Sequence, residues 1–325
     1  MTRALAVGLL CLLAPALARG YVRQTTSKNY APLAWRSGCV FVTPDVSGSR
    51  DIPADMALGE IQQAARNWTD RTAACSYMQF RIDGAQTGRR PGLDGFNLVI
   101  WLDDKWGHTV NGQFMPYSSS APAQTTIIFV DDPKSADNGK ILDADTEING
   151  VNFHFGIITP QSPMCLPGGC PGAPGCVMDL QNVLTHELGH MLGLDHTCYD
   201  GSEPVRPLDD QGQPVPDCTS TLPPAITEAT MYNYADCNET KKRSPEADDV
   251  NGICGAYPLS RDPNRCARVE PNDRGGCSCA VGASTPGSLA TGTLLVVTAL
   301  ACIRIRRRSG CGAAACGRTR SSDAA

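Results

Sequence analysis

Charged residues are few in this chain of 325 residues, and neither sign of charge dominates it. They make up 19% of the residues, and the formal net charge is −5. A charge content this low excludes a disordered polyelectrolyte, so we expect a folded protein. The acidic balance and the lack of a basic patch in the body of the chain argue against nucleic acid as a partner. The length suits one large domain or two small ones.

Paired CxxC units are absent from the body of the chain, although cysteine itself is abundant, with sixteen residues. Their absence argues against a metal site ligated by cysteine. An even set of body cysteines in an exported chain indicates a disulfide framework instead. Spacing does not determine the connectivity; we predict Cys39 with Cys75 and Cys198 with Cys218. The body cysteines are Cys39, Cys75, Cys165, Cys170, Cys176, Cys198, Cys218, Cys237, Cys254 and Cys266.

The first eighteen residues are typical of a secretory signal peptide. Arg3 provides the positive n-region, Ala4–Leu13 is an apolar h-region, and Ala16–Ala18 is a small-x-small cleavage site. A buried N-terminal helix is the alternative, but all three parts of a signal peptide occur here in order. We therefore predict an exported protein.

The C-terminal part of the sequence combines an apolar run with a cluster of arginines. Leu289–Ile303 is apolar and is followed by RIRRRS, which is typical of a membrane stop. With Cys277 and Cys279, the stretch Gly275–Arg308 resembles the MYXO-CTERM sorting tail of myxobacterial exported proteins. The resemblance implies a transient membrane anchor and an extracellular or cell-surface location.

These signals divide the chain into six parts. The predicted parts are a signal peptide (1–18), an extended N-terminal segment (19–38), one folded domain (39–260), a linker (261–280), a hydrophobic sorting segment with the arginine cluster (281–308) and a tail (309–325).

Strand and helix patterns are mixed within the body. Apolar residues recur at helical spacing in 51–70 and 178–194. A last helix is expected after Ser244 as N-cap, with Pro245 at the first helical position. These patterns predict an α+β fold, a twisted mixed sheet backed by helices. The expected strands are 39–45, 77–83, 97–104 and 123–132, with an extended stretch over 141–157.

Histidine is scarce, and the few histidines are concentrated. The chain has five, and three lie in HELGHMLGLDH, residues 186–196. Asp179 is a suitable N-cap for the helix that carries them. His186 and His190 are four residues apart, so on a helix both imidazoles can reach one point. Gly193 permits the left-handed conformation that ends a helix, after which His196 can turn back to the same point.

Three neutral imidazoles leave one tetrahedral position open, which is the ligand arrangement of a catalytic zinc ion. Glu187 lies about 100° round the helix from the histidines and borders the same cavity. An accidental surface helix is the alternative, and the five fixed positions of HExxHxxGxxH disfavour it. The other histidines, His108 and His154, are expected to be surface or half-buried side chains.

The long motif marks the metzincin zinc proteases, and the sequence resembles their matrixin branch over Cys39–Pro258. TMYNY, residues 230–234, resembles the Met-turn, which implies that Met231 lies beneath the metal as an apolar floor. Ordinary core packing is the alternative for this methionine. GKILDADTEIN (139–149) resembles the matrixin segment after the substrate-side edge strand. SPEADDVNGICGAYP (244–258) resembles the C-terminal helix.

The sequence also departs from the matrixin pattern. Thr197 follows the third histidine, where matrixins usually have serine. The gap to Met231 is long because of the insertion between Cys198 and Cys218, so substrate preference cannot be carried over. Asn233 stands where a tyrosine two residues after the methionine would be astacin-like.

The resemblance implies a metzincin-like catalytic domain with zinc in the cleft below the active-site helix. His186, His190 and His196 would bind one Zn²⁺, and Glu187 would be the general base toward a zinc-bound water. The protein would be a secreted endopeptidase, acting as a monomer on a protein or peptide that lies extended along an exposed strand edge.

Two other functions stay open at this stage. One is a non-catalytic envelope-binding protein on a protease fold, and the other is a zinc amidase that acts on cell-wall peptides. Calcium binding is a further alternative for the acidic segments, and solvation is the commoner state of such loops. The residues concerned are Asp131, Asp132, Asp143 and Asp145.

Overall fold

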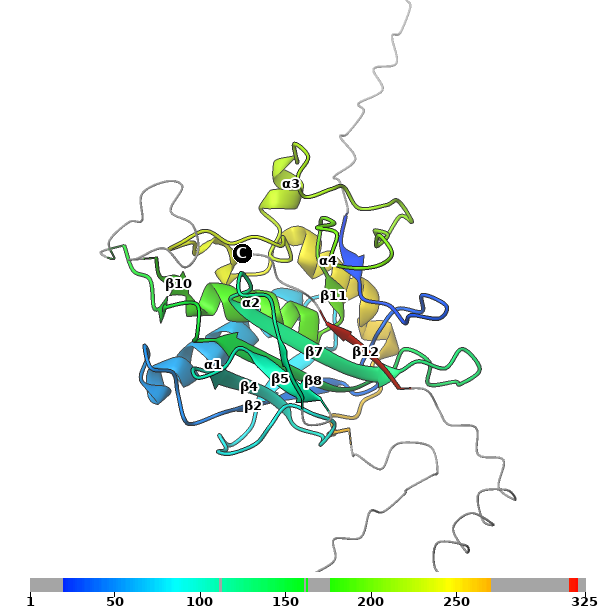
Figure 1. Cartoon of the computed structure of the whole chain (residues 1–325). Helices are drawn as coiled ribbons and strands as arrows, with labels where there is room; N and C mark the ends of the chain where they lie inside the picture. Colours follow the sequence, from blue (N-terminus) through cyan, green and yellow to red (C-terminus); the bar gives the residue numbers. More distant parts are fainter. Residues whose placement is uncertain (1–19, 111–112, 161, 163–175, 270–315, 321–325) are drawn as a thin grey trace, which may run out of the picture.

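The computed structural model describes residues 20–110, 113–160, 162, 176–269 and 316–320. It shows the expected α+β architecture, a mixed sheet with few helices (Figure 1). The predicted signal peptide, the cysteines at 165 and 170, and the sorting segment at 281–308 lie outside the described residues. Among the described helices, none combines the length and the apolar character that a membrane span requires.

The main sheet is mixed, and its strand order is not the order of the chain. Strands β8, β4, β2 and β3 run parallel, and β7 is antiparallel to β8. The spatial order is β12 (Cys316–Arg320), β7 (Ala123–Val130), β8 (Ile141–Asn149), β4 (Asn97–Leu102), β2 (Cys39–Pro44) and β3 (Gln79–Ile82). The predicted strands are therefore confirmed, and β12 is an addition that the sequence did not suggest.

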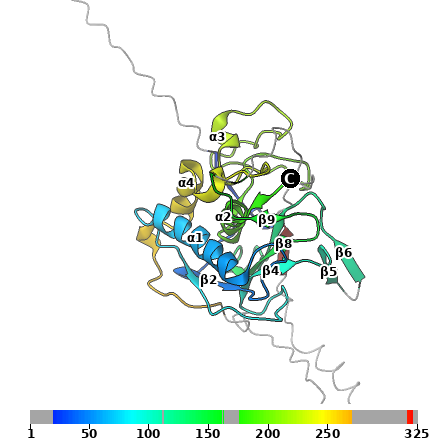
Figure 2. The same ribbon diagram turned by 90° about the vertical axis from the view of Figure 1, so that its left-hand side faces the viewer.

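Several short pairs of strands surround this sheet. They contain two to four residues each, too few to leave a recognisable pattern in the sequence. They are β1 (Val22–Arg23) with β11 (Leu194–Asp195), β9 (Phe155–Gly156) with β10 (Met178–Asp179), and the hairpin of β5 (Gly107–Val110) and β6 (Gln113–Pro116). Figure 2 shows this hairpin on the side of the molecule away from α1 and α4.

Two long helices pack against each other and against one face of the sheet (Figures 1 and 2). The buried face of α1 includes Ile61 and Trp68, both 1% exposed, and the indole Nε1 of Trp68 donates to the Thr185 carbonyl of α2 at 2.7 Å. This bond satisfies the indole inside an apolar core. The helices are α1 (Ala54–Thr72), α2 (Leu180–Met191), α3 (Pro224–Thr227) and α4 (Ala247–Ala256), with 3₁₀ turns η1 (Lys241–Arg243) and η2 (Leu259–Arg261).

The two predicted N-caps have different outcomes. Asp179 caps α2 as expected, because its side chain accepts from the Asn182 backbone N–H at 2.9 Å. Ser244 does not cap α4: it follows the turn η1, and the N-cap is Glu246. Glu246 and Asp249 form a reciprocal capping box, which begins the helix two residues later than the sequence suggested.

Four disulfides link distant parts of the described chain. They are Cys39–Cys266, Cys75–Cys254, Cys176–Cys237 and Cys198–Cys218. The predicted Cys198–Cys218 bond is confirmed, and the predicted Cys39–Cys75 bond is wrong.

The wrong pairing reflects where α1 ends. Cys39 begins β2, whereas Cys75 follows α1, beside the C-terminal end of α4. The backbone N–H of Tyr77 donates to the Tyr257 carbonyl at 3.1 Å, so this end of α1 faces α4 and its Cys254. Cys39 is bonded instead to Cys266, which anchors the segment after η2 to the body.

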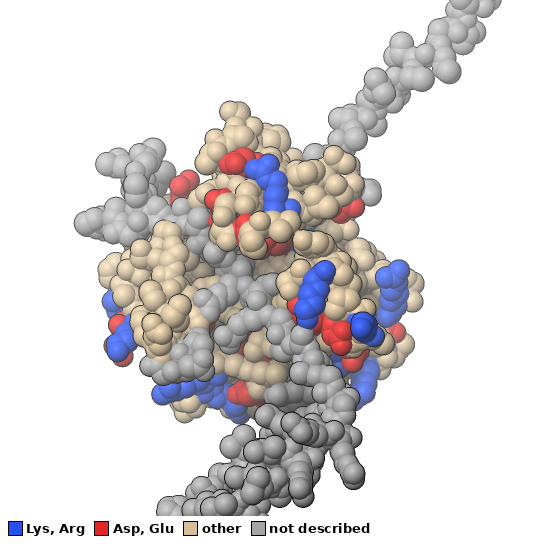
Figure 3. Space-filling model, turned by 45° about the vertical axis from the view of Figure 1, so that its right-hand side comes forward, with Lys and Arg blue, Asp and Glu red and all other residues tan. Residues whose placement is uncertain are grey.

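Acidic and basic side chains are interspersed on the surface. On the face drawn in Figure 3, Lys and Arg lie near Asp and Glu, and neither sign forms a continuous patch among the coloured residues. This distribution agrees with the low, mixed charge of the sequence.

The outer face of β8 carries buried carboxylates that hold a loop. Side chains alternate along a strand, so Asp143 and Asp145 point to the same face. Asp143 Oδ2 accepts from the backbone N–H groups of Asp94 and Gly95, at 3.1 and 2.9 Å. Asp145 accepts from Gly92 through one oxygen and from Leu98 through the other. Burial, the largest cause, raises the pKa of Asp143 to about 7, and burial together with Asp143 raises the pKa of Asp145.

This pair predicts a stability that depends on pH. A carboxyl group whose pKa is higher in the folded than in the unfolded protein favours folding most when it is protonated in both states, below about pH 4. This contribution to stability is lost as the pH rises through about 7, where the group must ionise in the folded protein. Asp143→Asn should remove the cost of the charge and keep both accepted bonds, because Oδ2 alone accepts the two backbone N–H groups and the amide nitrogen can take the place of Oδ1. We expect its free energy of unfolding at pH 8 to exceed that of the wild type by on the order of 2 kcal/mol. Urea unfolding at pH 5 and pH 8 measures this.

Asp145→Asn is the matched control. Both oxygens of Asp145 accept backbone N–H groups, so an amide nitrogen there would face a donor, and this variant should be less stable than the wild type at both pH values. A loss of stability in Asp143→Asn at pH 8 would contradict the assignment.

Candidate metal centre

Helix α2 brings two of the three motif histidines onto one buried face. His186 and His190 are 5% and 0% exposed, and their ring planes meet nearly at right angles. Both lie in the continuous helix Leu180–Met191, so their spacing of four residues places them one turn apart.

Gly193 brings the third histidine to them. Its φ is +87°, in the left-handed region, and a Cβ there would lie 2.8 Å from the Leu33 carbonyl oxygen. A side chain at this position is therefore disfavoured both by the backbone and by space. The Gly193 carbonyl accepts from the backbone of Gln24 and from Arg23 Nε, so the N-terminal segment holds the turn. After it, β1 pairs with β11, which leads directly into His196.

The three imidazoles converge through equivalent atoms. The Nε2 atoms of His186, His190 and His196 are separated by 3.1, 3.1 and 3.2 Å. Within the described residues, these histidines are the single group of three or more His, Cys, Asp or Glu residues whose ligand atoms can hold one metal ion. The predicted ligands are therefore brought together.

In two of the rings the other nitrogen, Nδ1, lies next to a backbone carbonyl, and His190 Nδ1 also lies 3.3 Å from the side-chain amide of Gln24. His186 Nδ1 lies 2.6 Å from the Thr230 carbonyl oxygen, and His190 Nδ1 lies 3.0 Å from the Leu194 carbonyl oxygen. A carbonyl only accepts, so in each neutral ring Nδ1 carries the proton and Nε2 presents a lone pair. Two lone pairs 3.1 Å apart repel each other unless a cation lies between them.

The triangle fits a first-row metal ion. One ion at metal–nitrogen distances of about 2.0–2.1 Å would be within reach of all three nitrogens, and it would keep a fourth tetrahedral position for another ligand. The donor set is all imidazole, which suits zinc, and also copper, iron and nickel. The structure shows that a metal ion can be held here, and the donor chemistry alone leaves its identity open.

Met231 packs directly against α2, the helix that carries His186 and His190. It is 1% exposed, and a Cβ at Gly189 would lie 2.3 Å from its Sδ and 2.9 Å from Trp68 Cζ2. Only glycine at 189 lets the methionine and Trp68 both approach α2 this closely. Next to it, the Thr230 carbonyl binds His186, so the turn at 230–231 supports the first ligand.

Helix α4 fixes this turn through Asp249. The carboxylate accepts from the backbone N–H groups of Thr230 and Met231, at 2.7 and 3.2 Å. Complete burial is the largest cause that raises the pKa of Asp249, to about 6. A chain of contacts thus runs from Asp249 through Thr230 to His186, and it orients the ring in the way that outer partners orient metal ligands.

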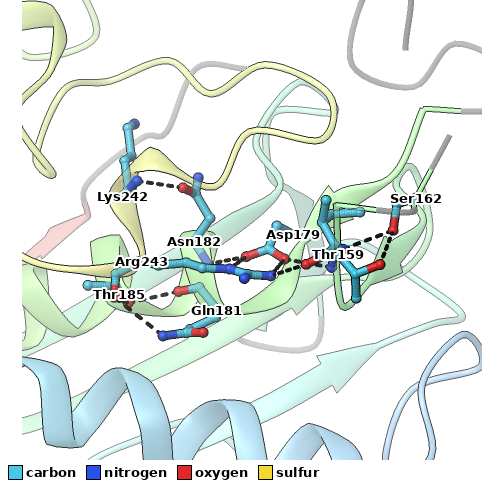
Figure 4. Close-up of polar contacts among 9 residues, drawn as sticks. Thr159, Ser162, Asp179, Gln181, Asn182, Thr185, Lys242 and Arg243 are labelled. Atoms are coloured by element: carbon cyan, nitrogen blue, oxygen red, sulfur yellow. Dashed lines mark hydrogen bonds and ion pairs between the residues drawn. The ribbon is translucent and has the colours of Figure 1, made fainter. Parts of the chain in front are cut away.

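The beginning of α2 is held by a second polar network (Figure 4). The Arg243 guanidinium binds both oxygens of Asp179 and donates to the Ile158 carbonyl. The backbone N–H of Lys242 donates to the Asn182 side chain at 2.7 Å. The segment that follows the Met231 turn is therefore bound to the first turn of α2.

Glu187 is buried, at 1% exposure, and bound to the sheet. Its Oε2 accepts a hydrogen bond from the Thr125 hydroxyl of β7 at 2.6 Å. Glu187, the expected general base, therefore lies in the same helix turn as His186 and His190, with a defined partner across the interface between α2 and the sheet.

The other residues considered from the sequence have different roles. His154 is exposed and bonds Asp51 at 3.2 Å, and His108 is half-buried and stacks on the Tyr117 ring. The aspartates considered for calcium do not belong to a metal-holding group among the described residues. Asp143 and Asp145 hold the loop described above, and Asp131 accepts from the Ser27 hydroxyl at 2.6 Å.

Three functional contacts were missed by sequence reasoning. Thr125 lies inside an apolar strand, where a threonine carries no distinctive signal. Thr230 acts through its carbonyl, which every residue has. For Asp249, the sequence indicated only an acidic residue in the first turn of a helix. Each contact joins segments that are far apart in the chain, so only the folded structure reveals it.

The edge of the sheet next to the site is paired. β12 runs antiparallel to β7, with Cys316 opposite Val130 and Arg320 opposite Thr126. The sequence predicted an exposed edge here, and that part of the prediction is wrong for β7. A peptide that adds a strand to β7 would take the place of these five residues.

No protein-family model matches this chain, and no curated protein sequence matches it. The site is therefore interpreted from its own geometry.

Proposed function

We propose that the protein is a zinc-dependent endopeptidase with a metzincin-like, matrixin-type catalytic domain. The observation that carries the proposal is the triangle of Nε2 atoms, 3.1–3.2 Å on each side, with a glutamate next to the first ligand in the sequence. Three further features support this choice over other metal sites. They are the motif HExxHxxGxxH, the buried Met231 beneath the helix and the antiparallel strand β7 beside it.

The proposal assigns a role to each residue of the site. His186, His190 and His196 would hold the ion, and the carbonyls of Thr230 and Leu194 keep the first two rings in the ligating tautomer. A zinc ion bound there would supply Lewis acidity and lower the pKa of a water molecule. Glu187 accepts the proton of the attacking water and delivers it to the departing amine. The backbone of β7 would align the peptide as an added strand in the place that β12 occupies.

The site is proposed to work outside the cytoplasm as a monomer. The predicted signal peptide and four disulfides suit an oxidising compartment. The apolar segment and arginine cluster would act as a transient anchor to the membrane.

Chelation tests the function. We expect the purified protein to cleave casein, to lose at least ~90% of this activity in o-phenanthroline, and to recover it when Zn²⁺ is added back, since three imidazoles release their ion to a strong chelator. Peptidoglycan incubated in parallel should stay intact. Digestion of peptidoglycan alone would favour an amidase, and the absence of any metal-dependent cleavage would favour a binding protein.

A further inference from the structure

The strongest unassigned feature near the site is a pair of buried threonines behind Glu187. Thr125 on β7 and Thr146 on β8 are directly opposite each other in the antiparallel register, and both are 0% exposed. Their hydroxyl oxygens are 2.8 Å apart. Thr125 Oγ1 also lies 2.6 Å from Glu187 Oε2 and 3.3 Å from the Glu187 carbonyl oxygen.

The number of protons sets the direction of these bonds. A hydroxyl has one proton, and the short contact to the carboxylate commits that of Thr125 to Glu187. The Thr146 hydroxyl must then donate to Thr125 Oγ1. Each bond polarises the next, so the carboxylate is held more firmly than by one hydroxyl alone.

The backbone makes this arrangement rigid. Threonine is branched at Cβ and has few side-chain conformations, and both residues lie in paired strands of the main sheet. Glutamate, in contrast, has three rotatable bonds. The two strands therefore supply the constraint that the glutamate side chain lacks.

We propose that Thr125, supported by Thr146, is a positioning residue that fixes the Glu187 carboxylate for proton transfer. The inference rests on the proposed function. It assigns part of the catalytic geometry to the sheet rather than to the helix that carries HExxH.

Thr125→Val and Thr125→Ser form the test pair. Valine has the shape of threonine without the hydroxyl, and serine keeps the hydroxyl. We expect kcat on a fluorogenic peptide to fall about 10–100-fold in Thr125→Val with KM changed less than about threefold, and Thr125→Ser to recover most of kcat. Thr146→Val should lower kcat less, because the direct bond to Glu187 remains. Metal content should stay at the wild-type level in all three.

Thr126→Val is the matched control. Thr126 is the next residue in β7 and is 6% exposed, and its buried hydroxyl has no hydrogen-bond partner among the described residues. Its removal should leave kcat unchanged. Equal kcat in Thr125→Val and the wild type, or equal losses in Thr125→Val and Thr125→Ser, would overturn the positioning role while leaving the endopeptidase intact. If the wild type showed no metal-dependent cleavage, the proposed endopeptidase function would be contradicted, and the positioning role of Thr125 would be contradicted with it.

Discussion

Glu187→Gln is expected to abolish peptide hydrolysis while the metal stays bound. The amide has the same shape and can still accept the hydrogen bond from Thr125, but it cannot take up a proton at neutral pH. Since general base catalysis contributes about 10²–10⁴-fold, kcat should fall by on the order of 10³ or more. The zinc-to-protein ratio should stay at one, because the glutamate lies outside the set of converging nitrogens.

The measurements are kcat on a peptide substrate and metal content by atomic absorption, both on the same preparation. Glu228→Gln serves as the control, since Glu228 pairs with Lys241 through a side chain that is 58% exposed. It should retain full activity. A metal-replete Glu187→Gln protein that still cleaves casein at more than about a tenth of the wild-type rate would refute the role of general base.

His196→Ala is expected to lose both the metal and the activity. The two remaining imidazoles on α2 would form an incomplete set, so the affinity for zinc should fall more than 100-fold, beyond the roughly 10–100-fold typical of outer partners. The fold should persist, because the four disulfides and the core under α2 do not depend on this ring. Zinc titration against a competing chelator measures the affinity, and thermal unfolding reports the fold.

His154→Ala controls for a general effect of removing histidine. His154 is exposed and bonds Asp51, and it is absent from the metal-holding group. Its metal affinity and activity should equal those of the wild type. If His196→Ala bound zinc as tightly as His154→Ala, the site would not contain three histidine ligands.

The metal site could be predicted because most of its geometry is local. His186 and His190 share one helix, and their spacing of four residues is the helical repeat. Gly193 ends that helix three residues later with a positive φ, which glycine adopts without a steric cost. Even His196 is brought back within ten residues of the first ligand. Helix spacing and the glycine turn, which act over a few residues, therefore predicted that all three histidines converge.

The disulfides show where local rules fail. Cys198 and Cys218 are 20 residues apart and close one loop, and their pairing was predicted correctly. Cys39 and Cys266 are separated by 227 residues, and Cys75 and Cys254 by 179. The second pair depends on where α1 ends relative to α4, and the first depends on where the segment after η2 meets β2. No spacing in the sequence encodes either.

The sequence by itself determined the α+β class, the three converging histidines, the capping of α2 by Asp179 and the turn at Gly193, because helix periodicity, capping and glycine conformation act over a few residues. The tertiary structure alone decided the partner of Glu187 on β7, the support of His186 by Thr230 and Asp249, and the buried pair of Asp143 and Asp145. Each of these depends on which strands and helices become neighbours, and that choice comes from packing the whole core rather than from any one segment.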